Sequence, residues 1–354
     1  MARRLRPRLE WLLVFVPISI FSQEVLHQAV LTFATACVAI VPLAGLIGKA
    51  TEDLSIRAGP RVGGLLNATF GNITEIIISV LLIAAGELSV VKASLIGSIL
   101  GNLVLVLGAS LLAGGIRYKE QRFSGRSAGT HAAALLLAVM GLLMPTLFVI
   151  YAPETEFQRL VVSGAVAIVL IGLYVANLAF SLITHQHLFR APAREEQPSW
   201  GVGRAVAVLL GAAVIVGLES ELLVGSLEPT VAALGVSREF IGLFVVAVIG
   251  NAAEHASAVL FAIRNKVDIA IEIAFGSSTQ IALFVAPALV FVSLLLPHQM
   301  DFIFAPIQVA AIALSTLIAA FMTMDGRSNW LEGAQLLGAY VIIGVSFFFI
   351  PGAR

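Results

Sequence analysis

The sequence predicts an all-α membrane protein that crosses the bilayer about eleven times. Of its 354 residues, 59% are hydrophobic and only 12% are charged, and the mean hydropathy is +1.00. Soluble domains carry about 25% charged residues, so the composition excludes a soluble fold. Apolar runs recur along the whole chain, and the basic residues gather in every second loop between them. Both patterns are typical of a polytopic membrane protein.

The apolar runs predict where the membrane-spanning helices lie. A helix needs about 20 apolar residues to cross about 30 Å of hydrocarbon. The first run is the weakest candidate, because its strictly apolar part from Trp11 to Phe21 is short and contains Pro17; it could also lie in the membrane interface. The expected spans are 9–26, 28–48, 62–85, 88–113, 128–150, 157–183, 203–224, 237–262, 267–296, 302–322 and 330–350.

Loop charges favour eleven spans and a cytoplasmic N-terminus. If all runs cross, seventeen of the 21 basic residues lie on the N-terminal side and four on the other. If the first run does not cross, the split falls to thirteen against eight, which fits the positive-inside rule less well. Acidic residues also number 21, so no net charge indicates a nucleic-acid partner, and the lipid bilayer is the expected partner. No small-residue cleavage site follows the Arg-rich N-terminus, so we expect it in the mature protein. Because it carries no long regulatory extension, we expect a prokaryotic plasma (inner) membrane, with an organelle membrane as the alternative.

The two halves of the chain repeat one another. A shift of 179 positions, without a gap, superimposes Gly71, Asn72, Glu75, Leu81, Gly97 and Ser98 on Gly250, Asn251, Glu254, Leu260, Gly276 and Ser277. Five spans per half place the halves in opposite orientations, as in secondary transporters that bind substrate at the midplane on interrupted helices. The expected organisation is an N-terminal segment with the first helix (1–27), a first five-helix repeat (28–183), a cytoplasmic linker (184–203) and a second, inverted repeat (204–354).

Each half contains a Gly-Asn-x-x-Glu pattern inside an apolar run, ending at Glu75 and at Glu254. A carboxylate at mid-membrane depth costs about 2.5–3.5 kcal/mol on insertion scales. Two such acids in matching settings favour a functional site over two structural buried acids. Because inverted symmetry would bring them together near the membrane centre, we interpret Glu75 and Glu254 as one paired site.

The residues around these acids supply further oxygen atoms. The amides three positions earlier share a helical face with each acid, although they could instead join helices. The preceding glycines mark points where a helix could open and present its carbonyls. Polar residues in the following spans could ligate directly, orient the carboxylates, or serve only as helix contacts. The candidate ligands besides the acids are Asn72, Asn251, Gly71, Gly250, Ser98, Ser277, Gln280 and Asn102.

This oxygen-only set suits Ca²⁺, which takes 6–8 oxygen ligands, and no pair of Cys or His favours a softer metal. Two bare carboxylates in a low dielectric are prohibitively costly, so the site must stay neutralised while it changes sides. One divalent cation neutralises it, and so do two protons, since burial and like-charge proximity favour protonated carboxyls. The competition predicts an antiporter with Glu75 and Glu254 as proton carriers. Ca²⁺ and H⁺ are then transported substrates, and no cofactor is expected.

The signature residues also resemble a known family. The stretch 63–75 (Gly-Gly-Leu-Leu-Asn-Ala-Thr-Phe-Gly-Asn-Ile-Thr-Glu) is similar to the first signature of the cation/proton exchanger (CAX) family, the Ca²⁺/H⁺ antiporters of the Ca²⁺/cation antiporter superfamily. The stretches 250–256 and 276–281 resemble the second signature and its continuation. The resemblance implies an eleven-span fold with Glu75 and Glu254 at the centre and with sliding second and seventh spans. It also implies that trimers occur in some members.

Four further residues are candidates for passing protons or cations to the centre. The sequence contexts of Glu52, Glu221 and Glu228 resemble acidic positions of the family, although solvated helix ends explain them equally well. His255 follows Glu254 directly and could relay protons, although a packed histidine with a single hydrogen bond is an equally good interpretation.

Three other functions remain to be weighed. A Na⁺/Ca²⁺ exchanger shares the architecture, but would usually carry more hydroxyls and a further acid where this chain has Asn72, Asn251, Asn102 and Gln280. An intramembrane metalloprotease would need a His-Glu-x-x-His helix, and none occurs, so we do not expect an enzyme. A passive channel fits poorly with inverted repeats and a site that must be neutralised.

Overall fold

The structure is a computed structural model that describes residues 9–152, 155–185 and 198–350. In this part of the chain, ten helices are long and apolar enough to cross a membrane, and a bent pair brings the number to eleven if it counts as one span. The first of them, Leu9–Leu26, passes the same test of length and hydropathy as the others. These helices confirm the predicted all-α class. The basic N-terminal residues 1–8 and most of the expected linker lie outside the described residues.

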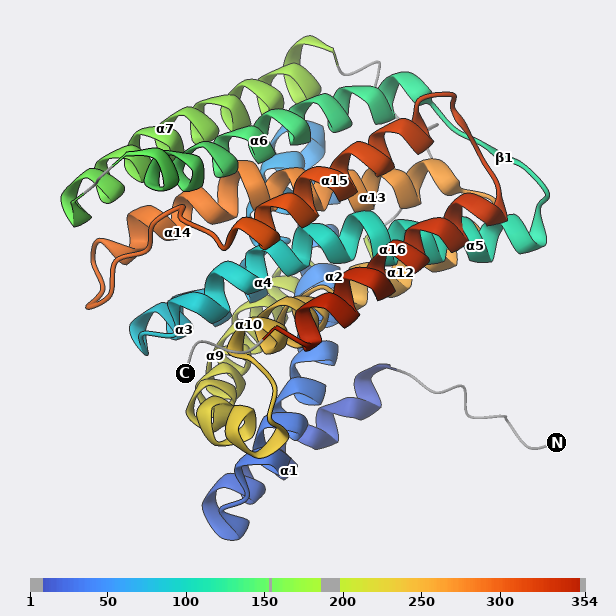
Figure 1. The fold of residues 1–354 in the computed structure, drawn as a ribbon. Helices are drawn as coiled ribbons and strands as arrows, with labels where there is room; N and C mark the ends of the chain where they lie inside the picture. Colours follow the sequence, from blue (N-terminus) through green and yellow to red (C-terminus); the bar gives the residue numbers. More distant parts are fainter. Residues whose placement is uncertain (1–8, 153–154, 186–197, 351–354) are drawn as a thin grey trace, which may run out of the picture. The chain divides into compact units, whose positions relative to one another are not determined.

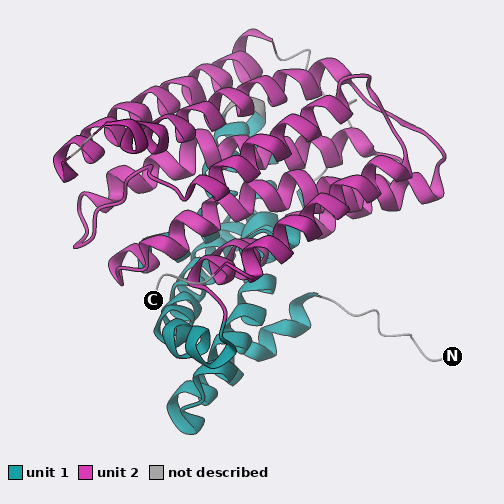
Figure 2. Cartoon of the chain, in the orientation of Figure 1, with its two compact units in different colours: residues 1–81, 196–235, 249–253 teal, residues 82–195, 236–248, 254–354 magenta. Residues whose placement is uncertain are grey.

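The chain divides into two compact units that do not follow the order of the sequence (Figure 2). Unit 1 comprises residues 1–81, 196–235 and 249–253. Unit 2 comprises residues 82–195, 236–248 and 254–354. Each unit therefore combines segments from both halves of the sequence.

Unit 1 is built around two long apolar helices that pack against each other, α2 (Ala29–Phe70) and α9 (Val202–Leu234). Their shared core contains Leu43, Ile47 and Ala50 of α2 together with Leu209 and Val216 of α9, at the spacing of one helical face. The N-terminal elements η1 (Leu9–Val14), α1 (Phe15–Phe21) and η2 (Ser22–Leu26) pack against α2, and α1 also contacts α9. Both α1 and α9 are labelled in Figure 1.

Both long helices extend beyond the predicted runs 28–48 and 203–224. The described helix α2 continues to a break at Gly59, whose φ of 79° is the left-handed conformation that glycine adopts most readily. The added turns of α2 are polar, and they include Asp53. The Asp53 carboxylate binds the residues that precede α9, because it accepts hydrogen bonds from Ser199 N at 2.8 Å, Ser199 Oγ at 3.0 Å and Trp200 N at 3.1 Å. Hydropathy cannot detect this extension, because side-chain hydrogen bonds stabilise it instead of apolar burial.

Unit 2 is a bundle in which helices from the two halves of the sequence pack against one another. The principal neighbours are α5 with α16, α6 with α15, α7 with α14, and α4 with η5; α6, α7 and α15 lie along one another in Figure 1. Two short strands pair antiparallel through Gln121 with Ser328 and Arg122 with Arg327. The elements are α4 (Leu88–Leu100), η3 (Gly101–Val106), α5 (Leu107–Arg117), β1 (Gln121–Arg122), α6 (Gly125–Tyr151), α7 (Glu156–Ala179), η4 (Phe180–Thr184), α10 (Arg238–Phe240), η5 (Ile241–Val246), α13 (Val267–Gln280), η6 (Ile281–Val285), α14 (Ala286–Ser293), α15 (Pro306–Thr323), β2 (Arg327–Ser328) and α16 (Trp330–Phe348).

Glycines allow α4 and η5 to cross at backbone contact. A Cβ on Gly97 would collide with the backbone of Leu243, and a Cβ on Gly242 would lie 2.6 Å from Val90 O. Small residues at such crossings bring helix backbones close together in membrane proteins. The stretch that begins at Gly97 in the sequence repeat is therefore held rigidly within unit 2.

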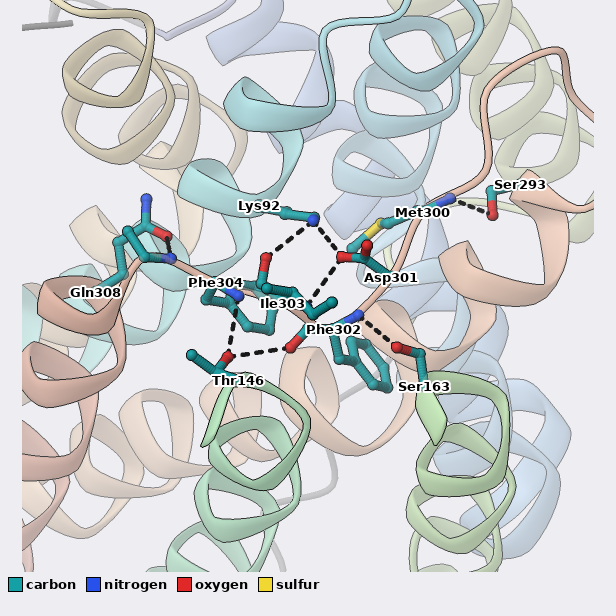
Figure 3. Close-up of polar contacts among 11 residues, drawn as sticks. Lys92, Thr146, Ser163, Ser293, Met300, Asp301, Phe302, Ile303, Phe304 and Gln308 are labelled. Atoms are coloured by element: carbon teal, nitrogen blue, oxygen red, sulfur yellow. Dashed lines mark hydrogen bonds and ion pairs between the residues drawn. The ribbon is translucent and has the colours of Figure 1, made fainter. Parts of the chain in front are cut away.

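An extended segment, residues 300–304, precedes α15 and passes beside α4 (Figure 3). Lys92 of α4 forms an ion pair with Asp301 and donates a hydrogen bond to Ile303 O at 2.9 Å. The two side chains of the ion pair are 17% and 20% exposed, so water screens this pair less than an ion pair at the surface.

The same segment is also bound to α6 and α7 (Figure 3). Ser163 Oγ accepts from Phe302 N at 2.9 Å, and Thr146 Oγ1 accepts from Phe304 N at 3.0 Å. Both phenylalanine side chains are buried. The predicted span 302–322 is therefore wrong at its start: α15 begins at Pro306, because side chains of neighbouring helices satisfy these N–H groups and no helical turn is needed.

Candidate functional site

The first signature interrupts a helix, as predicted. Helix α2 ends at Phe70, Gly71 and Asn72 form a turn, and α3 begins at Ile73 (α3, Ile73–Ala84). Asn72 is buried, and its carbonyl accepts from Ile76 N at 3.1 Å. Glu75 thus lies in the first turn of α3, where the positive end of the helix dipole favours a negative charge.

The second signature also contains a helix break. Helix α11 (Ala247–Gly250) ends at the glycine, the buried Asn251 forms the break, and α12 (Ala252–Ile263) begins directly after it. The chain bends by 63° across this break. Glu254 lies in the first turn of α12, just as Glu75 lies in the first turn of α3. The helix therefore bends at Gly250-Asn251, whereas residues 62–84 continue as one apolar span through the turn at Gly71 and Asn72.

Within unit 1, the first signature touches the second. A Cβ built on Gly250 would lie 3.2 Å from Oε1 of Glu75 and 3.5 Å from its carboxyl carbon. The carboxylate of Glu75 therefore lies close to the backbone of Gly250, and a side chain at that position would require it to shift by a few tenths of an ångström. The absence of a side chain at Gly250 lets this close approach occur.

Within unit 2, Glu254 is accompanied by residues from the repeat stretches. The Ser277 hydroxyl is directed toward the Glu254 carboxylate, although neither Ser277 Oγ nor Glu254 Oε2 has a hydrogen-bond partner of good geometry. Asn102 is fully buried, and its Oδ1 lies 3.1 Å from Nε2 of His255, while its Nδ2 has no partner. Such unsatisfied buried polar atoms are costly unless a ligand or water completes them.

Ser98, Ser277 and Gln280 lie on α4 and α13, each of which is followed at once by a π-helical stretch. Residues Gly101–Val106 (η3) follow α4, and Ile281–Val285 (η6) follow α13, so the feature recurs at matching points of the two halves. Ser98 and Ser277 are buried. Local π-helix is rare and frequently occurs at functional sites. A π-helical turn contains one residue more than an α-helical turn, and hydrophobic periodicity cannot distinguish the two. The sequence therefore contained no usable signal for these π-helical stretches.

The candidate relay residues do not share one environment. Glu52 of α2 and Glu221 and Glu228 of α9 have exposed side chains, whereas His255 contacts Asn102 as described.

Sequence reasoning overlooked Glu219, which is completely buried. The spacing of Leu209, Ala212 and Val216 along α9 places Glu219 on the same buried face, so the signal was present in the helical pattern.

The candidate residues are divided between the units (Figure 2). Unit 1 holds Glu75, Asn72, Gly71, Gly250 and Asn251, and unit 2 holds Glu254, Ser98, Asn102, Ser277 and Gln280. Across the described ranges, no three side chains of His, Cys, Asp or Glu are grouped so as to hold a metal ion. Any cation held by these residues would therefore depend on amide, hydroxyl and backbone oxygens as well as carboxylates.

Comparison with known proteins gives a consistent result. The profile of the sodium/calcium exchanger protein family matches residues 28–183 and again residues 204–349. The chain is 44% identical over 359 residues to a Ca²⁺/H⁺ antiporter of Aphanothece halophytica, with 96% of both chains covered. It is 42% identical to the Ca²⁺/H⁺ antiporter ChaA of Bacillus subtilis over 341 residues, covering 95% of this chain and 97% of the relative. A crystal structure of the Ca²⁺/H⁺ antiporter protein YfkE matches with a TM-score of 0.84 and 39% identity, covering 97% of this chain and 99% of that one.

Proposed function

The chain belongs to the sodium/calcium exchanger protein family, and we propose that it exchanges Ca²⁺, or a similar divalent cation, for H⁺ across the membrane. Relatives that share 42–44% of its residues along almost their whole length are Ca²⁺/H⁺ antiporters. The observation that carries the proposal is the contact of Glu75, in the first signature, with Gly250, in the second. It places an intramembrane acid of one half against the helix break of the other.

Glu75 and Glu254 are the groups that bind the transported ions. Each lies in the first turn of a helix that begins at a Gly-Asn break. The helix dipole favours the ionised form in both cases, whereas the low dielectric of the membrane opposes it. A carboxylate in such a balance is stable when a cation or a proton accompanies it. Ca²⁺ and H⁺ therefore compete for the same oxygens, and this competition couples their movements.

The remaining Ca²⁺ ligands come from neutral oxygens of the two signatures and their continuations. Asn72 and Asn251 contribute amide oxygens, and the interrupted helices leave backbone carbonyls at Gly71 and Gly250 available. Ser277 adjoins Glu254, and Ser98, Asn102 and Gln280 provide further oxygens. Such a set meets the preference of Ca²⁺ for 6–8 hard oxygen ligands. His255 positions Asn102 through their 3.1 Å contact.

The two repeats, matched separately by the family profile, operate as an inverted pair in which movement of α2 and α9 exposes the ions to alternate sides.

The protein resides in a prokaryotic plasma membrane with its N-terminus in the cytoplasm, in keeping with the positive-inside rule. Glu52, Glu221 and Glu228 deliver ions along α2 and α9. The protein acts as a transporter and not as an enzyme, and the family resemblance favours a homo-oligomer, which is a trimer in some members.

Transport in Na⁺-free proteoliposomes tests the exchange reaction. We expect Ca²⁺ uptake driven by a pH gradient alone, abolished by a protonophore that collapses the gradient. The alternative is a Na⁺/Ca²⁺ exchanger of the same family, which would require a Na⁺ gradient and would ignore the pH gradient. Uptake only with Na⁺ would contradict the proposal. A competition series with Mn²⁺, Mg²⁺ and Sr²⁺ against labelled Ca²⁺ would then rank the cations.

A further inference from the structure

Glu219 is a second kind of intramembrane acid, outside both signatures. It lies in the apolar helix α9, is completely buried, and has a buried Oε2 without a hydrogen-bond partner. Among the residues that the structure describes, no cation forms an ion pair with it. An ionised carboxylate in this setting would lack every usual form of compensation.

The hydrogen-bond geometry at Ser19 indicates how the acid is accommodated. Ser19, on α1, is also completely buried, and its Oγ lies 2.7 Å from Val16 O and 2.9 Å from Glu219 Oε1. Both oxygens are acceptors if Glu219 is ionised, but a serine hydroxyl carries only one hydrogen. One of the two short contacts would then lack a hydrogen, or both would share it at reduced strength.

A proton on Glu219 removes this conflict. The Ser19 hydroxyl then donates to Val16 O, as serines in helices commonly do. The carboxylic acid uses Oε1 to donate to Ser19 Oγ, which has lone pairs available. Both contacts acquire a hydrogen, and the remaining Oε2 is a neutral carbonyl oxygen, whose burial costs less than that of a charge.

Charged groups on the neighbouring helices do not offer another explanation. In the described part of the N-terminal segment, residues 9–27, the ionisable side chains are those of Glu10, Glu24 and His27, and all three are exposed. On α2, Asp53 and Arg57 bind Ser199 and Trp200 at the N-terminal end of α9, about twenty residues from Glu219, or roughly 30 Å along a helix. Lys49 lies over the Trp200 ring at 4.5 Å in the same region, and Glu52 is a further acid of that end.

We propose that Glu219 is a proton-binding site separate from the two signature acids, and that its proton joins α1 to α9 through Ser19. The ligand is H⁺ alone, because one carboxyl and one hydroxyl cannot ligate a divalent cation. Since α9 carries the acid and α1 the hydroxyl, the bound proton holds the N-terminal helix on α9. The inference depends on the Ser19 geometry and not on the proposed exchange reaction.

Infrared spectroscopy of the full-length protein in lipid tests this proposal. A protonated carboxyl has a C=O stretching band distinct from the bands of a carboxylate. At neutral pH and without Ca²⁺, we expect Glu219→Gln to remove one C=O band that wild type shows, and Ser19→Ala to shift that band because its hydrogen bond is lost. Glu24→Gln, at an exposed acid of η2, should leave the C=O region unchanged and remove a carboxylate band instead.

The opposite results would overturn the proposal. Loss of a carboxylate band in Glu219→Gln, with the C=O region intact, would show that the acid is ionised. The glutamine amide can still donate to Ser19, so this variant should fold. If it does not, Ser19→Ala decides independently: an unchanged C=O region in that variant contradicts a hydrogen-bonded, protonated Glu219.

Discussion

The carboxylate of Glu75 lies against Gly250, so close that a methyl group at position 250 would be 3.2 Å from Oε1. Both residues occur at helix interruptions, one in each half of the sequence. The second signature thus contributes more than its own acid, because its glycine lets the carboxylate of Glu75 lie close to the backbone. This relationship leads to the first prediction.

Gly250→Ala should weaken Ca²⁺ binding without unfolding the protein. The added Cβ displaces the Glu75 carboxylate by a few tenths of an ångström, and a small misplacement at a binding centre can cost about 10²-fold in rate. We expect at least a tenfold loss of exchange in proteoliposomes. Gly217→Ala is the matched control, since nothing lies within 4 Å of a Cβ at that position of α9. Equal activity of both variants would contradict the role of Gly250.

Glu75→Gln and Glu254→Gln should each abolish exchange while the protein remains folded. The amide retains the shape of the side chain, but it has no negative charge to neutralise the cation and takes up no proton at neutral pH. The measurement is pH-driven Ca²⁺ uptake, with thermal unfolding as the check on folding. Glu120→Gln, at an exposed acid near β1, should retain full activity. Near-normal transport by either signature variant would rule out the paired carboxylates.

Ca²⁺ affinity should increase with pH. Protonation of Glu75 and Glu254 excludes the cation, so raising the pH on the Ca²⁺ side should lower the apparent KM. If both acids must lose a proton, the dependence approaches a hundredfold per pH unit in the acidic range and levels off once both are ionised. Initial uptake rates at a series of Ca²⁺ concentrations and pH values provide the test. A KM that does not vary with pH would contradict the competition.

Asp53→Asn should loosen the start of α9. The Asp53 carboxylate is 5% exposed and accepts three hydrogen bonds from Ser199 and Trp200. Hydrogen bonds to a charged group contribute about 1.5–3 kcal/mol each at most, so we expect a clear decrease in Tm and earlier proteolysis near position 199. Glu52→Gln, the exposed neighbour, should change neither. Unaltered proteolysis in Asp53→Asn would contradict this role.

Lys92 and Asp301 should be energetically coupled (Figure 3). Removing one partner leaves a poorly hydrated charge on the other, so Lys92→Met and Asp301→Asn should each destabilise unit 2. The double variant should cost less than the sum of the two single variants, because neither charge then remains. Thermal unfolding of all four proteins measures the coupling. Additive effects would show that the ion pair contributes nothing beyond its separate residues.

Hydropathy determines most of the membrane helices from the sequence, because an apolar run of span length has few alternatives in a bilayer. The bend at Gly250-Asn251 is also predictable, because glycine followed by a polar residue inside an apolar run marks a point where a helix can open. The start of α15 is not predictable in this way. Residues 302–305 are as apolar as the membrane-spanning helices, but Ser163 and Thr146 accept hydrogen bonds from the backbone N–H groups of Phe302 and Phe304. Because these two acceptors lie far away in the sequence, hydropathy cannot reveal them.

The sequence by itself determined the class of the protein, its repeats and the two acids that carry the proposed chemistry, because burying a charge in apolar runs is too costly to be incidental. Only the tertiary structure decided what each acid contacts. It placed Glu75 against Gly250 and buried Glu219 beside Ser19, while it left Glu221 exposed two residues later. The physical reason is that one residue along a helix rotates a side chain by about 100°. The surroundings of an acid therefore depend on which helices pack against its face of the helix, and the composition of the chain does not determine that packing.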